Sequence, residues 1–435
     1  MVDDYLRTSD PDIYAVGDVI QVDDFIFQEP AMIPLAGPAN KQGRIAANNI
    51  AGAQETYEKT QGTSVAKVFD LAVASTGANE KALIKRGLQK GRDYETIIIT
   101  QNSHAGYYPG AVPITLKLLF SSDGKKIFGA QIVGRDGVDK RIDTLAVAIR
   151  LGAGIHDLKN LELAYAPPFS SAKDPVNMAG FMAENLLTGK VAFAAWDAVE
   201  QSPEAVLLDV REDAELMAFS LPNATHIPLG QLRNRLKELD PSRKTIVFCA
   251  IGVRAYNAAR ILMHNGFHNV KLYPGGARFY QSTHYAADAV QPSEQTRYAD
   301  NGQMETNNIP TSAMRLDCSG MQCPGPIMKV FETMKKMPNG AVMEVSASDP
   351  GFTRDIGAWC RRTGNELMAC ELRGKDYVAL VKKGGPAVPE QKEAAEGKTI
   401  IVFSGDLDKV LASFIIANGA AAWADLLPCS LPSGD

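Results

Sequence analysis

The sequence predicts a multidomain protein that combines α/β and α+β folds. At 435 residues, the chain is long enough for two to four domains. Between about residues 197 and 283, a strand, a turn and a helix recur in "AVLLDV", "TIVFCA" and "NVKLYPGG", which is typical of a parallel α/β unit. Two polar stretches, residues 286–314 and 384–397, lack the apolar surface needed to fold, so they predict linkers between domains.

The linkers and changes of pattern divide the rest of the chain into five regions. These regions are residues 1–62, 63–190, 197–285, 315–383 and 398–435. The first two alternate strand-like and helix-like stretches. The fourth predicts strand, helix, strand, helix and a hairpin that turns at Gly374 to Asp376. The last region contains one strand, "TIIVFSG", and one helix, and because two elements cannot close a parallel core, we expect an incomplete α/β segment there.

Composition and charge exclude several classes of function. The net charge of −5, with a pI near 5.8, argues against a nucleic-acid partner, which needs a clustered basic excess. No apolar run reaches the roughly 18 residues that span a bilayer, and no basic and apolar leader is present, so we expect a cytoplasmic protein. Six scattered cysteines suit a reducing compartment. Zinc is a weak alternative because only Cys318 and Cys323 lie close together, without a nearby histidine, and we predict no metal site.

A lone cysteine, Cys249, follows the apolar strand "TIVF" and precedes "AIGVR". A thiol becomes a nucleophile as a thiolate, which is favoured by backbone N–H groups, a helix N-terminus or a cation. The stretch offers all three: a tight loop at Gly252, the charge of Arg254, and a helix that Gly266 is placed to end. The alternative is a buried cysteine that finishes a strand, which is the commoner fate of a free thiol.

Residues 206–276 resemble the rhodanese family. The matching pieces are "LLDVRE", "ATHIPLGQL", the loop "CAIGVR" and "LYPGGARFY". In that family the cysteine attacks a sulfane sulfur, holds it as a persulfide cradled by the loop amides, and passes it to a thiol acceptor. The resemblance implies a rhodanese domain, a three-layer parallel α/β fold, over residues 197–285. The implied catalytic residues are Cys249, Arg254, Asp209 and Arg211, and the implied substrate contact is Gly252.

A second candidate thiol lies in "LDCSGMQCPGPIMKVFETMKKM". Pro324 suits a first helical turn, which makes Cys323 the expected N-cap residue with its sulfur on the helix dipole. The alternative is an N-cap cysteine without chemistry. Residues 315–383 resemble the TusA/SirA sulfur-carrier family, whose "CPxP" cysteine accepts a persulfide sulfur, and the resemblance implies a two-layer βαβαββ fold, the TusA-like domain. Cys318 is a weak candidate for a resolving disulfide with Cys323, and no role is assigned to the remaining cysteines, Cys360, Cys370 and Cys429.

The first region predicts a short strand that ends in Gly-Asp, "TSDPDIYAVGDV", followed by a proline-rich turn into a helix, "AMIPLAGPANKQGR". An aspartate at a strand end can bind a hydroxyl group, and a helix N-terminus can face a ring or a phosphate. The order resembles that of the flavin disulfide reductases of the CoA-disulfide reductase type. This resemblance implies FAD, with Thr8, Gly17 and Asp18 on its ribityl and pyrophosphate part and Ala36 against the flavin.

The same resemblance extends over residues 63–190, which we name the dimerisation domain, an α+β fold. Tyr107, in "HAGYYPGA", and Tyr165, in "LAYAPPFSS", match the pair that reaches across the family's dimer interface toward the reactive cysteine and flavin. The resemblance implies a homodimer in which Tyr165 contacts the cofactor. It also implies that a CoA substrate is contacted by Tyr107, Lys173 and Asn40. The alternative is that these tyrosines only anchor an interface.

Family members carry a Gly-rich FAD fold, a redox cysteine and an NAD(P)H domain before the equivalent of Thr8. No G-x-G-x-x-G follows a suitable strand in this sequence. We therefore expect no NAD(P)H site, and FAD binding that is weak or absent. Because residues 398–435 resemble the start of a DsrE/F-like domain, we expect the chain to be part of a longer fusion of reductase, rhodanese, carrier and DsrE domains, whose N-terminal half is missing here.

These features predict a sulfurtransferase in which Cys249 takes sulfane sulfur and passes it to Cys323. The expected partners are small thiol and sulfane-sulfur compounds (CoA, polysulfide, thiosulfate) and sulfur-acceptor proteins. A second hypothesis is a non-enzymatic dimeric carrier or scaffold. A third is a working flavoenzyme that reduces CoA disulfide, CoA persulfide or polysulfide.

Overall fold

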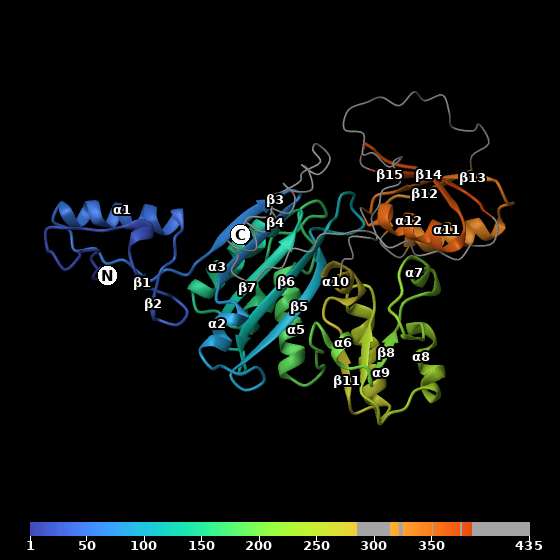
Figure 1. Ribbon diagram of the computed structural model, residues 1–435, viewed down its shortest axis with the longest axis horizontal. Helices are drawn as coiled ribbons and strands as arrows, with labels where there is room; N and C mark the ends of the chain where they lie inside the picture. The colour runs from blue at the N-terminus through green and yellow to red at the C-terminus, as the bar shows by residue number, and fades with distance from the viewer. Residues whose placement is uncertain (285–313, 322–324, 350, 375, 385–435) are drawn as a thin grey trace, which may run out of the picture. The chain divides into compact units, whose positions relative to one another are not determined.

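The computed structural model describes residues 1–284, 314–321, 325–349, 351–374 and 376–384 (Figure 1). The chain divides into two units, Met1–Val388 and Pro389–Asp435, and the second lies outside the described residues. The expected incomplete segment at 398–435 and nearly all of both expected linkers lie outside them as well. Among the helices that are described, none is both long and apolar enough to cross a membrane.

The N-terminal segment, residues 1–62, is built around one helix. Its elements are η1 (Gly17–Val19), β1 (Val22–Asp23), β2 (Pro30–Ala31) and α1 (Ala36–Ile50). The helix follows the proline-rich turn as predicted. The predicted strand before Gly17 is wrong: Tyr14 makes a single antiparallel bridge with Arg7, and a 3-10 turn follows. The physical reason is that Leu6, fully buried with φ of 69°, leaves the extended conformation next to Arg7, so the pairing does not grow into a strand.

The dimerisation domain is an antiparallel sheet in the order β3-β4-β7-β6-β5. Its strands are β3 (Ser64–Val68), β4 (Leu71–Gly77), β5 (Tyr94–Asn102), β6 (Pro113–Ser121) and β7 (Ile127–Gly134). Its helices are α2 (Glu80–Lys85), α3 (Val138–Arg150), α4 (Ile155–Asn160) and α5 (Pro175–Leu187). Helices α3 and α5 contact the sheet and each other (Figure 1). Apolar residues alternate along β6, and this alternation buries Ile114, Leu116 and Leu118 completely beneath the helices.

The rhodanese domain is a parallel sheet in the order β11-β10-β8-β9, which confirms the predicted parallel α/β unit. Its strands are β8 (Val206–Asp209), β9 (Thr225–His226), β10 (Thr245–Phe248) and β11 (Val270–Leu272). Its helical elements are α6 (Ala198–Gln201), α7 (Asp213–Ala218), α8 (Leu229–Arg235), η2 (Leu236–Glu238), α9 (Val253–His264) and α10 (Gly276–Thr283). Phe248 pairs in register with Asp209, so the carboxyl ends of β10 and β8 lie side by side.

The TusA-like domain has the predicted βαβαββ order and a mixed sheet, β12-β13-β15-β14. Its elements are β12 (Met314–Cys318), α11 (Gly325–Lys336), β13 (Val342–Ala347), α12 (Phe352–Thr363), β14 (Glu366–Arg373) and β15 (Asp376–Lys382). Helices α11 and α12 lie along one side of the sheet (Figure 1). The last two strands pair from Arg373 with Asp376, as the predicted hairpin requires.

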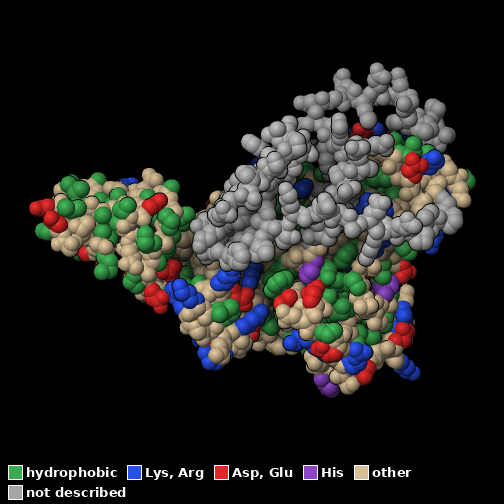
Figure 2. Space-filling view, in the orientation of Figure 1, with side chains coloured by type: hydrophobic (Ala, Val, Ile, Leu, Met, Phe, Trp, Pro, Cys, Tyr) green, Lys and Arg blue, Asp and Glu red, His purple; other side chains and the backbone are tan. Residues whose placement is uncertain are grey.

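Charged side chains of both signs share the surface. In the face drawn in Figure 2, Lys and Arg side chains lie interspersed with Asp and Glu side chains over the rhodanese domain. This mixture agrees with the net charge of −5 for the whole chain.

Candidate functional site

Cys249 lies directly after β10, whose four residues are all buried. Its own side chain is 1% exposed and belongs to a core cluster with residues of α9. This burial is what the alternative of a strand-finishing cysteine requires. The contacts of the sulfur and of the surrounding loop decide whether the thiol is also placed for chemistry.

The loop places a backbone donor and a helix N-terminus against the sulfur. The N–H of Gly252 donates to Sγ of Cys249 over 3.1 Å. Gly252 is the N-cap residue of α9 and has φ of 119°, a conformation that disfavours other residues. Because the positive end of the α9 dipole therefore faces the loop, an anionic sulfur is stabilised there. The predicted helix and its end near Gly266 are both present, since α9 stops at His264.

A second backbone contact fixes the loop from the other side. The N–H groups of Ala277 and Arg278 donate to the carbonyl oxygens of Cys249 and Ala250, over 2.8 and 3.1 Å. Gly276 permits this approach, because a Cβ atom there would lie 2.5 Å from the oxygen of Cys249. Sequence reasoning did not single out Gly276, although the Gly-Gly pair before α10 was a usable signal.

Arg254, the predicted cation of the site, is held by a carboxylate. Its Nη1 and Nη2 donate to Oε2 and Oε1 of Glu215 over 2.6 and 2.7 Å. Burial alone would lower the pKa of Arg254, but the hydrogen bonds and charge of Glu215 outweigh it and raise the pKa. The negative charge of a Cys249 thiolate would add to the rise. Glu215 was missed by sequence reasoning, because no local pattern connects it with a residue 39 positions later.

Asp209 and Arg211, predicted as catalytic residues, form a buried pair with each other. The guanidinium of Arg211 donates to both oxygens of Asp209, over 2.7 to 3.1 Å, and to the carbonyl oxygen of Phe219 over 2.8 Å. The two side chains are 5% and 1% exposed. Because Phe219 directly follows α7, this pair fixes the helix that carries Glu215. The contacts support a positioning role at the end of β8.

The predicted tyrosines of the dimerisation domain meet each other. The hydroxyl groups of Tyr107 and Tyr165 are 2.7 Å apart, although both side chains are exposed, at 58% and 47%. The hydrogen bond with Tyr107 raises the pKa of Tyr165. Lys173 is exposed, with its ammonium 5.9 Å from the centroid of the Phe181 ring. The pair thus presents two hydroxyl groups at one point of the surface.

A buried ion pair holds the two loops that carry these tyrosines. Arg141 donates to Oδ2 of Asp174 from Nε and Nη2, over 3.1 and 2.9 Å, and to the carbonyl oxygen of Ser103 over 2.7 Å. Asp174 also accepts from Oγ of Ser170 and caps α5 through the N–H of Val176. The two charged side chains are each 2% exposed. Neither was predicted as functional.

The predicted cofactor residues of the N-terminal segment are exposed or half-buried. Asp18 and Ala36 are exposed, and no side chain caps the N-terminus of α1. Gln42, which is 3% exposed and was missed, accepts from the N–H of Gly17 over 2.7 Å and so ties the Gly-Asp turn to α1. Thr8 bonds within its own turn, and Asn40 bonds the carbonyl oxygen of Ala36.

These groups fit one end of a flavin dinucleotide: a free carboxylate for a hydroxyl group and a helix N-terminus for a ring or phosphate. Within the part of the chain that is described, no Gly-rich loop joins a strand to a helix in the manner that cradles a pyrophosphate. The residues present would therefore contact such a cofactor on one side only.

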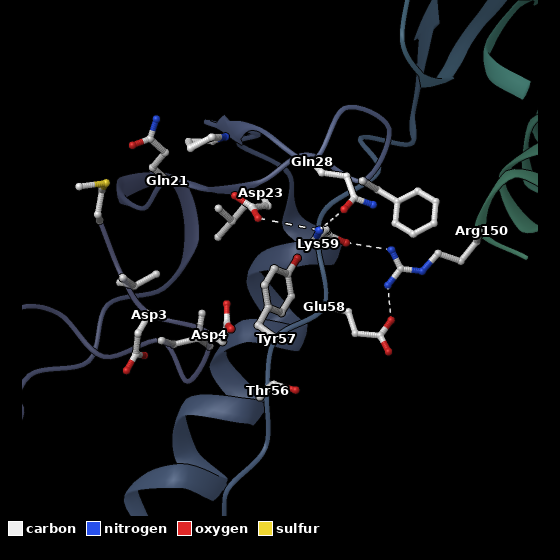
Figure 3. A pocket seen from close by; sticks show the side chains of 16 residues that line it. Asp3, Asp4, Gln21, Asp23, Gln28, Thr56, Tyr57, Glu58, Lys59 and Arg150 are labelled. Atoms are coloured by element: carbon white, nitrogen blue, oxygen red, sulfur yellow. Dashed lines mark hydrogen bonds and ion pairs between the residues drawn. The ribbon is translucent and has the colours of Figure 1, made fainter. Parts of the chain in front are cut away.

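A cavity of about 490 Å³ opens elsewhere in the same segment (Figure 3). Among its lining residues, Lys59 donates to Gln28 over 2.7 Å, and Arg150 of α3 bonds the carbonyl oxygen of Lys59 over 2.9 Å and the side chain of Glu58. The predicted cofactor and substrate residues do not line it. The cavity is therefore separate from the predicted site.

The described cysteines of the TusA-like domain are buried or half-buried, and burial raises the pKa of each. The raised values are about 11 for Cys318, 12 for Cys360 and 11 for Cys370. Cys323, with its expected N-cap position, and Cys429 lie outside the described residues. No group of three or more His, Cys, Asp or Glu side chains able to hold a metal occurs among the residues described.

Three family models match separate parts of the chain. Residues 63–175 match the dimerisation domain of pyridine nucleotide-disulphide oxidoreductases, residues 194–283 match the rhodanese-like domain, and residues 314–383 match the sulfurtransferase TusA.

Two curated relatives are coenzyme A disulfide reductases. That of Staphylococcus epidermidis is 39% identical over 179 residues, 41% of this chain and 40% of that protein. That of Staphylococcus aureus is 38% identical over 184 residues, 42% of this chain and 41% of that protein. The chain thus spans about two fifths of the length of these relatives.

Two solved structures are similar over a larger part of the chain. The reduced CoADR-RHD of Bacillus anthracis is 48% identical, with a TM-score of 0.60, over 65% of this chain and 50% of that one. The NAD-dependent persulfide reductase of A. fulgidus is 40% identical, with a TM-score of 0.58, over 64% of this chain and 50% of that one.

Proposed function

Because the chain contains a disulphide-oxidoreductase dimerisation domain, a rhodanese-like domain and a TusA domain, we propose that it is a sulfurtransferase within a disulfide- or persulfide-reducing system. The observation that carries the proposal is the donation from Gly252 N–H to the sulfur of Cys249 at the N-terminus of α9. A core cysteine needs no such donor, whereas an anionic thiolate or persulfide is stabilised by it.

In the first step, the thiolate of Cys249 attacks the outer sulfur of a donor R–S–SH. The bond between the two donor sulfurs breaks as the new S–S bond forms, giving Cys249–S–SH and R–S⁻, which keeps the electron pair. No external oxidant or reductant is needed, because the sulfane sulfur moves without a net change in oxidation state. The loop amides and the α9 dipole stabilise the anionic form of the persulfide.

In the second step, the thiolate of Cys323 attacks the outer sulfur of Cys249–S–SH. The products are Cys323–S–SH and the Cys249 thiolate, so atoms and charge balance and the first site is restored. Both cysteines belong to one chain, which raises the effective concentration of the acceptor to roughly millimolar. Cys323 is thus the proposed carrier.

The reductase part is proposed from the relatives' names. We propose a homodimer through the dimerisation domain, with the Tyr107 and Tyr165 hydroxyl groups facing a CoA disulfide, CoA persulfide or polysulfide substrate. Asp18 and the N-terminus of α1 would hold one end of FAD, which supplies electron transfer when bound. Since the described residues would contact the flavin on one side only, we propose that the isolated chain does not retain FAD. Flavin absorbance near one equivalent in the purified protein contradicts this.

The test of sulfur transfer is the intact mass of the reduced chain after a brief incubation with glutathione persulfide, followed by peptide mapping. We expect one added sulfur (about 32 Da) on each of Cys249 and Cys323. With Cys249→Ser, loading of Cys323 slows strongly; with Cys323→Ser, Cys249 still loads. Sulfur on Cys323 at an unchanged rate in Cys249→Ser supports instead the non-enzymatic carrier, and no added sulfur in the parent chain defeats both.

A further inference from the structure

The fixed cation of the rhodanese site is neutralised within the fold. Arg254 and Glu215 form a two-pronged pair, and their side chains are 24% and 4% exposed. A carboxylate that lies against a guanidinium in this two-pronged geometry cancels most of the field of the guanidinium. The remaining attraction for an anionic donor comes from the loop amides and the α9 dipole.

We infer that Glu215 is a specificity-determining residue that favours organic persulfides over doubly charged donors such as thiosulfate. This inference rests on the proposed function, because it concerns the donor of the same cysteine. An organic persulfide releases a thiolate with one charge, whereas thiosulfate releases sulfite with two. A site whose cation is already paired offers less stabilisation to the doubly charged sulfite that leaves from thiosulfate.

The other charges around the loop do not replace Arg254. The loop positions between Cys249 and Arg254 are Ala250, Ile251, Gly252 and Val253, which carry no charge. Arg211 is bound in two-pronged fashion by Asp209, and the guanidinium of Arg278 also carries an ion pair. Loop composition and arginine pairing thus point the same way.

Glu215 is held so that it cannot release Arg254 without cost. Its Oε2 also accepts from the N–H of Glu212 over 2.9 Å, which closes the first turn of α7. The Asp209–Arg211 pair fixes the far end of α7 through Phe219. The carboxylate is therefore a built part of the site, in contrast with a mobile surface acid.

The test compares sulfur loading of Cys249 from thiosulfate and from glutathione persulfide in the full chain. Glu215→Gln keeps the size of the side chain and removes its charge. We expect the rate of loading from thiosulfate, relative to that from the persulfide, to rise about tenfold, the order expected for one charge a few ångströms away at intermediate dielectric. Glu215→Ala, which removes the charge together with the acceptor of the Glu212 N–H, serves as a second variant with the same expected direction.

The matched control is Glu238→Gln, which breaks a two-pronged pair with Arg235 on the surface of the same domain, with both bonds 2.7 Å long. It should leave the ratio of the two rates within about twofold. Arg254→Gln removes the cation and leaves the Glu215 charge, so it should change the ratio in the opposite direction.

The outcomes separate the two proposals. An unchanged ratio in both Glu215 variants, with both donors still loading Cys249, overturns the role of Glu215 and leaves sulfur transfer standing. A parent chain that loads faster from thiosulfate than from the persulfide also overturns it. If neither donor loads Cys249 in the parent chain, the proposed function itself is wrong.

Discussion

Replacing Arg141 with methionine should unfold the dimerisation domain more readily than any surface change. Methionine keeps much of the side-chain volume but removes the charge and the hydrogen bonds to Asp174, Ser103, Ser170 and Gly137. The carboxylate of Asp174 is then left 2% exposed without its cation. Breaking a buried pair in this way costs about 3–5 kcal/mol of the free energy of unfolding.

Hydrogen exchange is the suitable assay, because a chain of several domains does not unfold in one step. A loss of about 3–5 kcal/mol lowers the protection of β6 amides roughly 10²- to 10⁴-fold, at 1.36 kcal/mol for each factor of ten. Adding Asp174→Asn removes the stranded charge while an N-cap oxygen remains, so the double variant should recover part of the loss. A decrease below tenfold in Arg141→Met, or a double variant less protected than the single one, refutes the reasoning.

Three further predictions concern the thiols, the tyrosine pair and the loop. At pH 8, iodoacetamide should label Cys249 before Cys318, Cys360 and Cys370, because the raised pKa values of these three cysteines keep them protonated. Earlier labelling of one of the three in peptide mapping contradicts this. Tyr107→Phe removes the hydrogen bond that raises the pKa of Tyr165, so in a spectrophotometric titration Tyr165 should ionise at lower pH than in the parent; an unchanged curve means that the bond is absent in solution. Gly276→Ala places a methyl group 2.5 Å from the carbonyl oxygen of Cys249, and its φ of 68° adds strain, so sulfur loading should fall at least about tenfold; loading at the parent rate shows that the loop does not need this approach.

Local sequence patterns predicted the parts of the fold whose cause is local. The apolar strand before Cys249, the helix after Gly252 and the hairpin turning at Gly374 all depend on residues close in sequence, and all are present. The strand expected before Gly17 failed because pairing needs a partner, and an isolated stretch does not reveal whether one exists. Strand propensity is therefore weaker evidence than helical periodicity in a short segment.

The electrostatic parts of the candidate site could not be predicted in the same way. Glu215 and Arg254 are 39 positions apart, and Arg141 and Asp174 are 33 apart, so their pairing is a product of tertiary packing. The sequence identified Arg254 as a cation of the loop, and the fold supplies its counter-charge. A charged residue near a reactive thiol is thus a guide to location, and the net field is known only from the packed structure.

The depth of Cys249 has a kinetic consequence. Since Cys249 is 1% exposed, a donor can meet the sulfur only after residues packed around it move aside. The rate of sulfur loading should consequently reach a maximum at high donor concentration. This maximum is set by how often the site opens, so it should be the same for donors of different size. The same burial lengthens the lifetime of a stored sulfur atom, because thiols in solution cannot reach the persulfide while the site is closed.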